Sequence, residues 1–93
     1  MLIEFPLDAT LTAGAIGACA AMNEIGYTTT ALHGHSPVFT VTIRRRDGAL
    51  CDVTDALKFG LLLARELADP AAIDQAMEAI RQRTIFVRGL LVT

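Results

Sequence analysis

The stretch VFTVTIRRR, residues 38–46, decides the fold because its side chains alternate between apolar and polar. Phe39, Val41 and Ile43 point to one side of an extended chain, whereas Arg44 and the threonines between them point to the other. A period of two is typical of a strand with one buried face. The stretch therefore predicts a sheet that has a core on one side.

The residues on either side of this strand predict more strands. Asp47-Gly48 follows it, and both residues tolerate the positive φ of a type I′ turn, so a returning strand is expected over Ala49–Val53. The other expected strands cover residues 1–5, 27–32 and 84–92. Residues 84–92 lack a polar face, which is typical of a central strand or of a contact between subunits.

Three helices are predicted from apolar residues at three- and four-residue spacing and from capping residues. They extend from Asp8, Thr10 or Thr12 to Gly26, from Asp52 or Thr54 to about Ala68, and onward from Asp69-Pro70. The expected inner row of the first helix is Leu11, Ala15, Cys19, Met22 and Ile25. In the second helix it is Leu57, Leu61, Ala64 and Ala68, widened by Phe59, Leu63 and Leu67. In the third helix it is Ile73, Met77 and Ile80. Asp55, Lys58, Arg65, Glu66 and Asp69 are expected on the solvent side of the second helix, with Leu62 among them.

The predicted order is therefore β-α-β-β-β-α-α-β. It gives an α+β fold in which helices pack on one face of a mainly antiparallel sheet. At 93 residues, the chain is expected to form one domain over residues 1–93.

The composition excludes several classes of protein. With 53% hydrophobic residues, the chain is too apolar to be disordered. Its eight basic residues are outnumbered by ten acidic ones, so a surface that binds nucleic acid is not expected. No apolar run approaches the roughly 18–20 residues of a membrane span, and no signal peptide is recognisable, so a cytoplasmic protein is expected.

The same apolar fraction is large for so small a chain. A chain of this size buries only about 60–65% of the surface that its unfolded form exposes, so some apolar side chains have to remain outside. The first helix is rich in glycine and alanine, and these small side chains form a side against which another chain segment can pack closely. We therefore expect this helix, the helix over 55–68 and residues 85–92 to be buried in a multi-chain assembly.

Both histidines lie in one short segment, His33-Gly34-His35. On a strand, residues i and i+2 project to the same side, so both imidazoles could bind one metal ion; the alternative is a pair of solvated loop histidines. Cys19 and Cys51 lack the Cys-x-x-Cys spacing of zinc or redox sites and are expected to be reduced, packed thiols.

A set of residues around the histidines resembles a known enzyme family. The matching residues are Leu32-His33-Gly34-His35, the alternating residues 39–43, Gly48, Asp52 and Leu57-Lys58. They are similar to the 6-pyruvoyl-tetrahydropterin synthase and 6-carboxy-tetrahydropterin synthase group. The resemblance implies a T-fold, in which subunits join their sheets into a barrel and bind a pterin-like ligand between them. It also implies that His33 and His35 are zinc ligands.

The chain departs from this family at three functional positions. The family's late glutamate, which anchors the substrate, has no match in residues 85–92. Leu11 stands where the family has its third zinc histidine, and residues 28–30 are threonines near the place of its catalytic cysteine. The resemblance covers residues 32–58. It therefore implies a zinc-binding protein whose active site is degenerate or shared between subunits, with Asp8, Cys19 or a neighbouring subunit as the source of a third ligand.

A second resemblance covers the same segment. His35 to Phe39, the following strand, Asp47-Gly48 and the closing helix look like part of the double-stranded RNA-binding domain. That family holds phosphates with a lysine cluster at the start of its last helix. In this chain, Lys58 is the only lysine near the start of the corresponding helix. The alternative function is therefore a module that resembles the double-stranded RNA-binding domain but lacks its lysine cluster.

Exposed arginine and leucine side chains provide the remaining candidate site. Arg44, Arg45 and Arg46 form either a solvated hairpin tip or a contact for an anion or acidic partner. With Leu62 and Leu90 they are the predicted partner-binding residues. No catalytic set or cofactor motif is recognisable, and zinc at the histidine pair is the only cofactor that the residues suggest. The function expected first is a small non-enzymatic interaction protein that self-associates or binds a protein partner.

Overall fold

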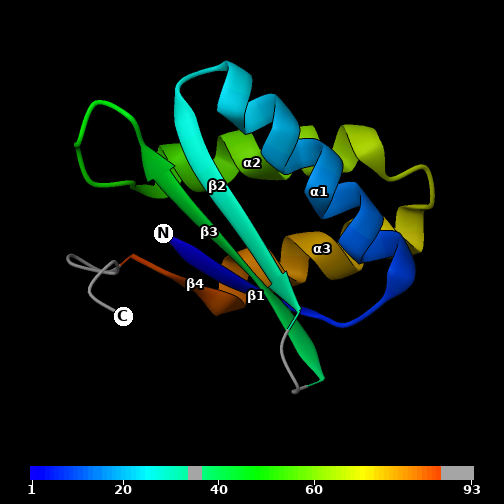
Figure 1. The fold of residues 1–93 in the computed structure, drawn as a ribbon. Helices are drawn as coiled ribbons and strands as arrows, with labels where there is room; N and C mark the ends of the chain where they lie inside the picture. Colours follow the sequence, from blue (N-terminus) through cyan, green and yellow to red (C-terminus); the bar gives the residue numbers. More distant parts are fainter. Residues whose placement is uncertain (34–36, 87–93) are drawn as a thin grey trace.

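The computed structural model describes residues 1–33 and 37–86 of the 93-residue chain (Figure 1). Its elements are β1 (Leu2–Pro6), α1 (Ala9–Glu24), β2 (Tyr27–His33), β3 (Val38–Arg45), α2 (Val53–Glu66), α3 (Pro70–Arg83) and β4 (Thr84–Ile85). The α+β class is confirmed. The predicted element order also agrees, except that the expected strand over Ala49–Val53 does not form.

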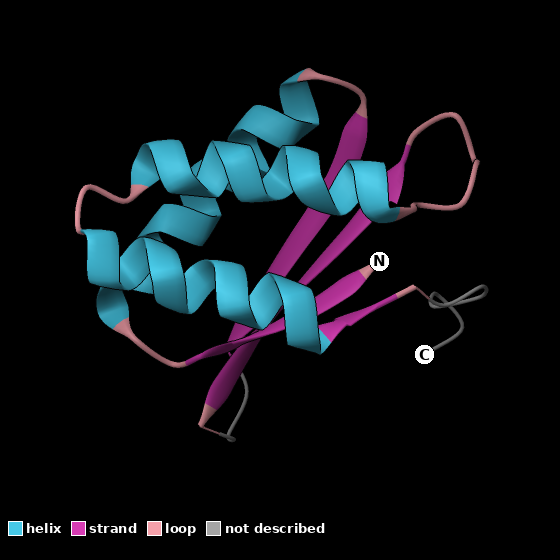
Figure 2. Ribbon diagram, turned by 180° about the vertical axis from the view of Figure 1, so that it is seen from behind, coloured by secondary structure: helices cyan, strands magenta, loops and turns pink. Residues whose placement is uncertain are grey.

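The four strands form one sheet in the order β2-β3-β1-β4, and every neighbouring pair is antiparallel. The three helices lie together on one face of this sheet (Figure 2). The chain thus follows a β-α-β-β-α-β path of two interleaved β-α-β units, with α2 and α3 in place of the second helix. No helix in the described residues is both long enough and apolar enough to span a membrane.

The core lies between the sheet and the helices, as the alternation in residues 38–46 predicts. Phe39, Val41 and Ile43 are buried, and Phe39 stacks on Phe5 of β1 with ring centroids 5.2 Å apart. Phe59 of α2 packs against Phe5 from the helix layer at 6.2 Å. These aromatic contacts join the two central strands to the helices.

Helix α1 begins and ends where the capping signals place it. The Asp8 carboxylate accepts hydrogen bonds from the backbone N–H groups of Thr10 and Leu11 at 2.9 and 3.0 Å. After the helix, Gly26 adopts a φ of +112°, which favours glycine. Ile25, expected in the inner row, is exposed because the helix has already ended there.

The small-residue side of α1 packs against α2 of the same chain. A Cβ on Gly14 would lie 2.7 Å from Leu67 Cδ2 and 3.3 Å from Leu63 Cδ1, so the helices approach too closely for a larger residue. The predicted close neighbour is therefore present. It is supplied within the chain, which corrects the expectation that this side of α1 needs a second subunit.

Local hydrogen bonds prevent the expected strand over Ala49–Val53. The Asp47 carboxylate accepts from the Ala49 N–H at 2.8 Å, and Asp52 and Asp55 cap α2 reciprocally. These bonds hold the segment in a turn and a helix start. Both edges of β3 are already paired, with β1 and β2, so the segment does not pair with β3. Gly48 does have the predicted positive φ, +85°, although no hairpin follows it.

Helix α2 is rotated relative to the predicted orientation. Its buried residues are Asp55, Ala56, Phe59, Gly60 and Leu63, whereas Leu57 and Leu61, expected inside, are exposed. Apolar residues occur nearly all round this helix, so their spacing alone did not define its inner side. The close approach to α1 and the ring contact with Phe5 select the face that carries Phe59 and Leu63.

Helix α3 buries a row of alanines and keeps its larger side chains half-buried. Ala72, Ala76 and Ala79 are buried, and α3 packs on β1 through this side. Met77 and Ile80 lie next to Gly60 of α2, so the predicted stripe of Ile73, Met77 and Ile80 faces α2 at the margin of the core. Pairing of β4 with β1 is described only for Thr84 and Ile85. Phe86 is described but is not part of the strand, and residues 87–92 of the predicted last strand lie outside the described residues.

Candidate functional site

The structure places His33 at the end of β2, in register with Phe39 of β3. His35 lies outside the described residues. Residues 1–33 and 37–86 contain no group of three or more histidine, cysteine or acidic side chains arranged to hold a metal ion. The zinc pair His33–His35 therefore stays a prediction from the sequence.

The three consecutive arginines have three different surroundings. Arg44 is exposed, and its guanidinium has no partner among the described residues. Arg45 forms an ion pair with Asp47 at 3.0 Å, and Arg46 donates to the Asn23 carbonyl near the end of α1 at 2.6 Å. The structure thus uses Arg45 and Arg46 within the chain, which leaves Arg44 as the arginine available to a partner.

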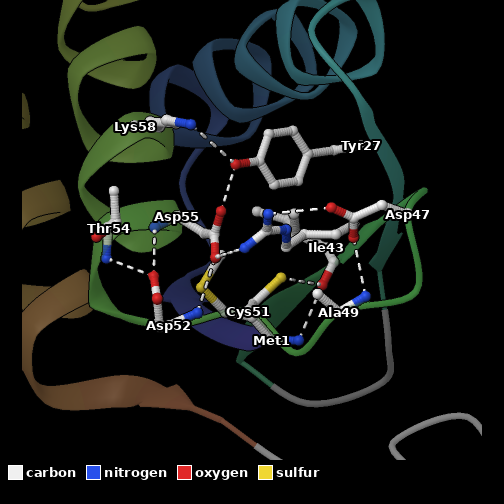
Figure 3. A network of polar contacts seen from close by, with 11 residues as sticks. Met1, Tyr27, Ile43, Asp47, Ala49, Cys51, Asp52, Thr54, Asp55 and Lys58 are labelled. Carbon is white, nitrogen blue, oxygen red and sulfur yellow. Dashed lines mark hydrogen bonds and ion pairs between the residues drawn. The ribbon is translucent and has the colours of Figure 1, made fainter.

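A buried polar network joins β2, β3 and the start of α2 (Figure 3). The Tyr27 hydroxyl donates to Asp55 Oδ1, and the Asp52 backbone N–H donates to Asp55 Oδ2 at 2.8 Å. Arg45 Nη1 lies 3.9 Å from Asp55 Oδ2, and Lys58 Nζ lies 3.5 Å from the Tyr27 hydroxyl. Asp55 is only 2% exposed, so almost all of its interactions are with protein groups.

The charge states in this network favour a structural role. Burial would raise the pKa of Asp55, but hydrogen bonds from Tyr27 and the Asp52 backbone, together with the charge of Arg45, outweigh it and lower that pKa. Burial and the neighbouring Asp55 raise the pKa of Tyr27 to about 12, which keeps the phenol protonated as a donor. A protonated tyrosine and a carboxylate that is already fully bonded are poorly suited to proton transfer with a substrate.

Sequence reasoning missed this network because it assigned Asp55 to the solvent side of its helix. The structure shows the opposite. A signal was present in the sequence, because Asp52 and Asp55 have the spacing of a capping box, in which the acidic residue at the third helical position bonds back to the chain. Tyr27, 28 residues earlier in the chain, gives no comparable local signal.

The largest exposed apolar side chains on α2 form a row that we call the α2 ridge: Val53, Leu57 and Leu61. They follow one another at four-residue spacing and are 63%, 61% and 69% exposed. Leu62, the predicted contact residue, is instead half-buried and packs against the core. The accessible leucines of α2 are thus the two that sequence reasoning placed inside. Leu90, the other predicted contact, lies outside the described residues.

Two shallow pockets occur next to these elements. One, of about 340 Å³, lies between β1 and α3 and is lined by the charged residues Glu4, Glu78 and Arg83 together with apolar ones. The other, of about 380 Å³, lies between α1 and β2 and is lined by Thr12, Ile16, Cys19, Ala20, Asn23, Ala31 and Phe39.

Both cysteine thiols are free, as expected from their spacing. Cys19 is buried and Cys51 is half-buried. Burial raises the pKa of each thiol, which disfavours the nucleophilic thiolate.

Comparison with protein-family models, with curated proteins and with solved structures finds no match to this chain. The function is therefore inferred from the residues and their geometry.

Proposed function

We propose that this chain is a small non-enzymatic interaction protein that binds a protein surface through the α2 ridge. The observation that carries the proposal is the exposure of Val53, Leu57 and Leu61, each above 60%, in one row on an ordered helix. A contiguous exposed apolar surface of this kind is typical of a protein contact. Full burial of one such side chain contributes about 1.5–3 kcal/mol, so the row is enough to anchor a helix in a partner's groove.

The polar network around Asp55 also supports binding in preference to catalysis. Tyr27 donates a hydrogen bond to Asp55 and Arg45 forms an ion pair with it, and this arrangement fixes the start of α2 against the sheet. A rigid helix loses little conformational entropy when its exposed face is covered, which favours affinity. Arg44, whose guanidinium is unpaired within the described residues, adds a charged contact elsewhere on the surface.

Site-specific crosslinking tests the proposal. A photo-crosslinking amino acid is placed at Leu61 in the full chain, which is then made in its natural host cell. The matched control carries the same amino acid at Leu7, an exposed leucine of the β1–α1 loop that is 48% exposed. We expect a discrete protein product from position 61 that is absent or much weaker from position 7.

The identity and affinity of the product complete the test. A product of twice the 9.9 kDa chain identifies a second copy, and any other mass identifies a different protein. Leu57→Gln together with Leu61→Gln should then weaken binding of the purified partner at least tenfold, whereas Leu7→Gln should not. Equal crosslinking from positions 61 and 7 would contradict the proposal.

A further inference from the structure

Strand β2 lies at one edge of the sheet and, in the part of the chain that the structure describes, lacks the features that usually protect such an edge. It pairs only with β3 within the described residues, and its register with β3 runs from Tyr27 to His33 without a bulge. Its sequence, YTTTALH, contains no proline and no lysine, arginine or acidic residue. Natural edge strands are commonly shortened, charged, bulged or covered to prevent pairing with another chain.

The hydrogen-bonding pattern shows which backbone groups of β2 point away from the sheet. The Arg46 N–H donates to the Gly26 carbonyl at 3.0 Å, which makes Gly26 and Arg46 a hydrogen-bonded pair in the β2–β3 register. Because such pairs alternate along an antiparallel ladder, Thr28, Thr30 and Leu32 bond to β3. The N–H and C=O groups of Tyr27, Thr29 and Ala31 therefore point toward the free edge.

A groove and an uncharged side of α1 adjoin this edge. The groove is the pocket of about 380 Å³ between α1 and β2. The Oγ1 atom of Thr12, one of the groove residues, is buried and has no hydrogen-bond partner within the described residues. Ile16 and Ala20, which line this groove, are exposed and form an apolar side of α1 next to β2.

From these observations we infer that the chain forms a symmetric dimer in which β2 pairs antiparallel with β2 of a second copy. The unpaired backbone groups specify a strand as the occupant, because only an extended chain matches donors and acceptors that alternate in this way. The inference goes beyond the proposed function, because it names a second copy of the chain as a partner and assigns it a surface other than the α2 ridge.

A second copy fits this edge without repulsion. With the two-fold axis at Thr30, Thr30 faces its own copy and Thr29 faces the second copy's Ala31, so the outward-pointing groups of both strands meet. No like charges are opposed, because neither β2 nor α1 before Glu24 carries a charged residue apart from the histidine at the end of β2. The same axis brings the two apolar sides of α1 toward one another, where Ile16, 54% exposed, becomes covered.

Amide hydrogen exchange, measured by NMR on the full chain, tests the inference within one strand. In a dimer, the amides of Thr29 and Ala31 are protected as well as those of Thr28, Thr30 and Leu32, and their protection decreases on dilution. In a monomer, only the amides of Thr28, Thr30 and Leu32 are hydrogen-bonded and therefore protected. Exchange of Thr29 and Ala31 that does not slow as protein concentration rises would overturn the inference.

Two variants, at different places in the proposed contact, test the dimer through its mass in solution. Ala31→Pro removes an outward N–H and leaves the hydrogen bonds to β3 in place, and Ile16→Lys puts a charge on the apolar side of α1 without touching the strand. Sedimentation should give twice 9.9 kDa for the wild type and 9.9 kDa for each variant, with unchanged circular dichroism. A dimeric mass for a folded Ile16→Lys variant would overturn the inference.

Failure of this inference and failure of the proposed function are distinguishable. In one outcome, the amides of Thr29 and Ala31 are unprotected and the double variant Leu57→Gln, Leu61→Gln dissociates the dimer. The α2 ridge is then the dimer contact, so the edge pairing is wrong and the proposed function stands. If the edge is protected but crosslinking from positions 61 and 7 is equal, the dimer stands and the ridge proposal fails.

Discussion

The two sides of α2 contain the same kinds of residue but have different surroundings. On the inner side, Phe59 and Leu63 are completely buried between α1 and the sheet. On the outer side, Leu57 and Leu61 remain largely in solvent. The apolar excess of this chain therefore has two uses: part of it builds a closely packed core within the chain, and part of it is left for contacts that the single chain does not make.

The largest difference between the two sides is expected from removing large side chains. Phe59→Ala should lower the free energy of unfolding by about 3–5 kcal/mol, because it leaves a cavity beside Phe5. Leu61→Ala should change it by about 0.5 kcal/mol or less, because little apolar surface is lost. Urea unfolding of the two variants measures both values. A cost above about 2 kcal/mol for Leu61→Ala would show that the ridge is covered within the chain.

The next largest effect is expected at the buried end of α2. Asp55→Ala removes the acceptor of Tyr27 and the partner of the Asp52 N–H, and should destabilise the chain by about 2–3 kcal/mol. Asp47→Ala is the control, because its ion pair with Arg45 is on the surface, where solvent screens it and its contribution to stability is small. Equal losses in the two variants would contradict a structural role for Asp55.

The same network predicts how stability depends on pH. The pKa of Asp55 is lowered by folding, so its contribution is present at neutral pH and is lost as the pH falls below about 4. The pKa of Tyr27 is raised to about 12, so its contribution is complete below pH 10 and is lost as the pH rises from 10 through 12.

Chemical unfolding of wild type and Tyr27→Phe as a function of pH checks this dependence. The difference in stability between them should decrease at both extremes of pH. A difference that stays constant from pH 3 to pH 11 would contradict a lowered pKa for Asp55 and a raised pKa for Tyr27.

The smallest effect is expected where α1 faces the inner side of α2. Gly17→Ala should stabilise the chain by about 0.5–1 kcal/mol, because alanine favours the helix and the new Cβ meets only the flexible end of exposed Glu66. Gly14→Ala should gain less or lose stability, because its Cβ would meet the buried Leu67. Thermal unfolding of both variants measures the difference, and a higher melting temperature for Gly14→Ala than for Gly17→Ala would contradict this packing.

The sequence was informative where one local signal determined the outcome. The alternation of residues 39–43 predicted the buried side of the sheet, and Asp8, Gly26 and Asp69-Pro70 predicted helix ends. It was misleading where two signals competed, as at Ala49–Val53, where side-chain hydrogen bonds outweighed a turn signal. The face of α2 depends on its packing with α1 and Phe5, which are distant in sequence, so helical spacing alone did not determine it.

The candidate site was less predictable than the fold. The ridge spacing of Val53, Leu57 and Leu61 was visible in the sequence, but the same spacing fits a buried row equally well. Whether a row is inside or outside depends on the tertiary contacts of α2. In the same way, the sequence does not show that Arg45 and Arg46 are bonded within the chain and that Arg44 has no partner among the described residues.

If another protein chain covers the apolar surface left exposed by this fold, the chain should be isolated from its cells in a larger complex. Native mass spectrometry of the chain, isolated intact from the cells that make it, measures this. We expect a species heavier than 9.9 kDa that reverts toward the bare chain when Ile16→Lys, Leu57→Gln and Leu61→Gln are combined. A wild-type chain that is recovered only as a 9.9 kDa monomer, at every concentration at which it is isolated, would contradict this expectation.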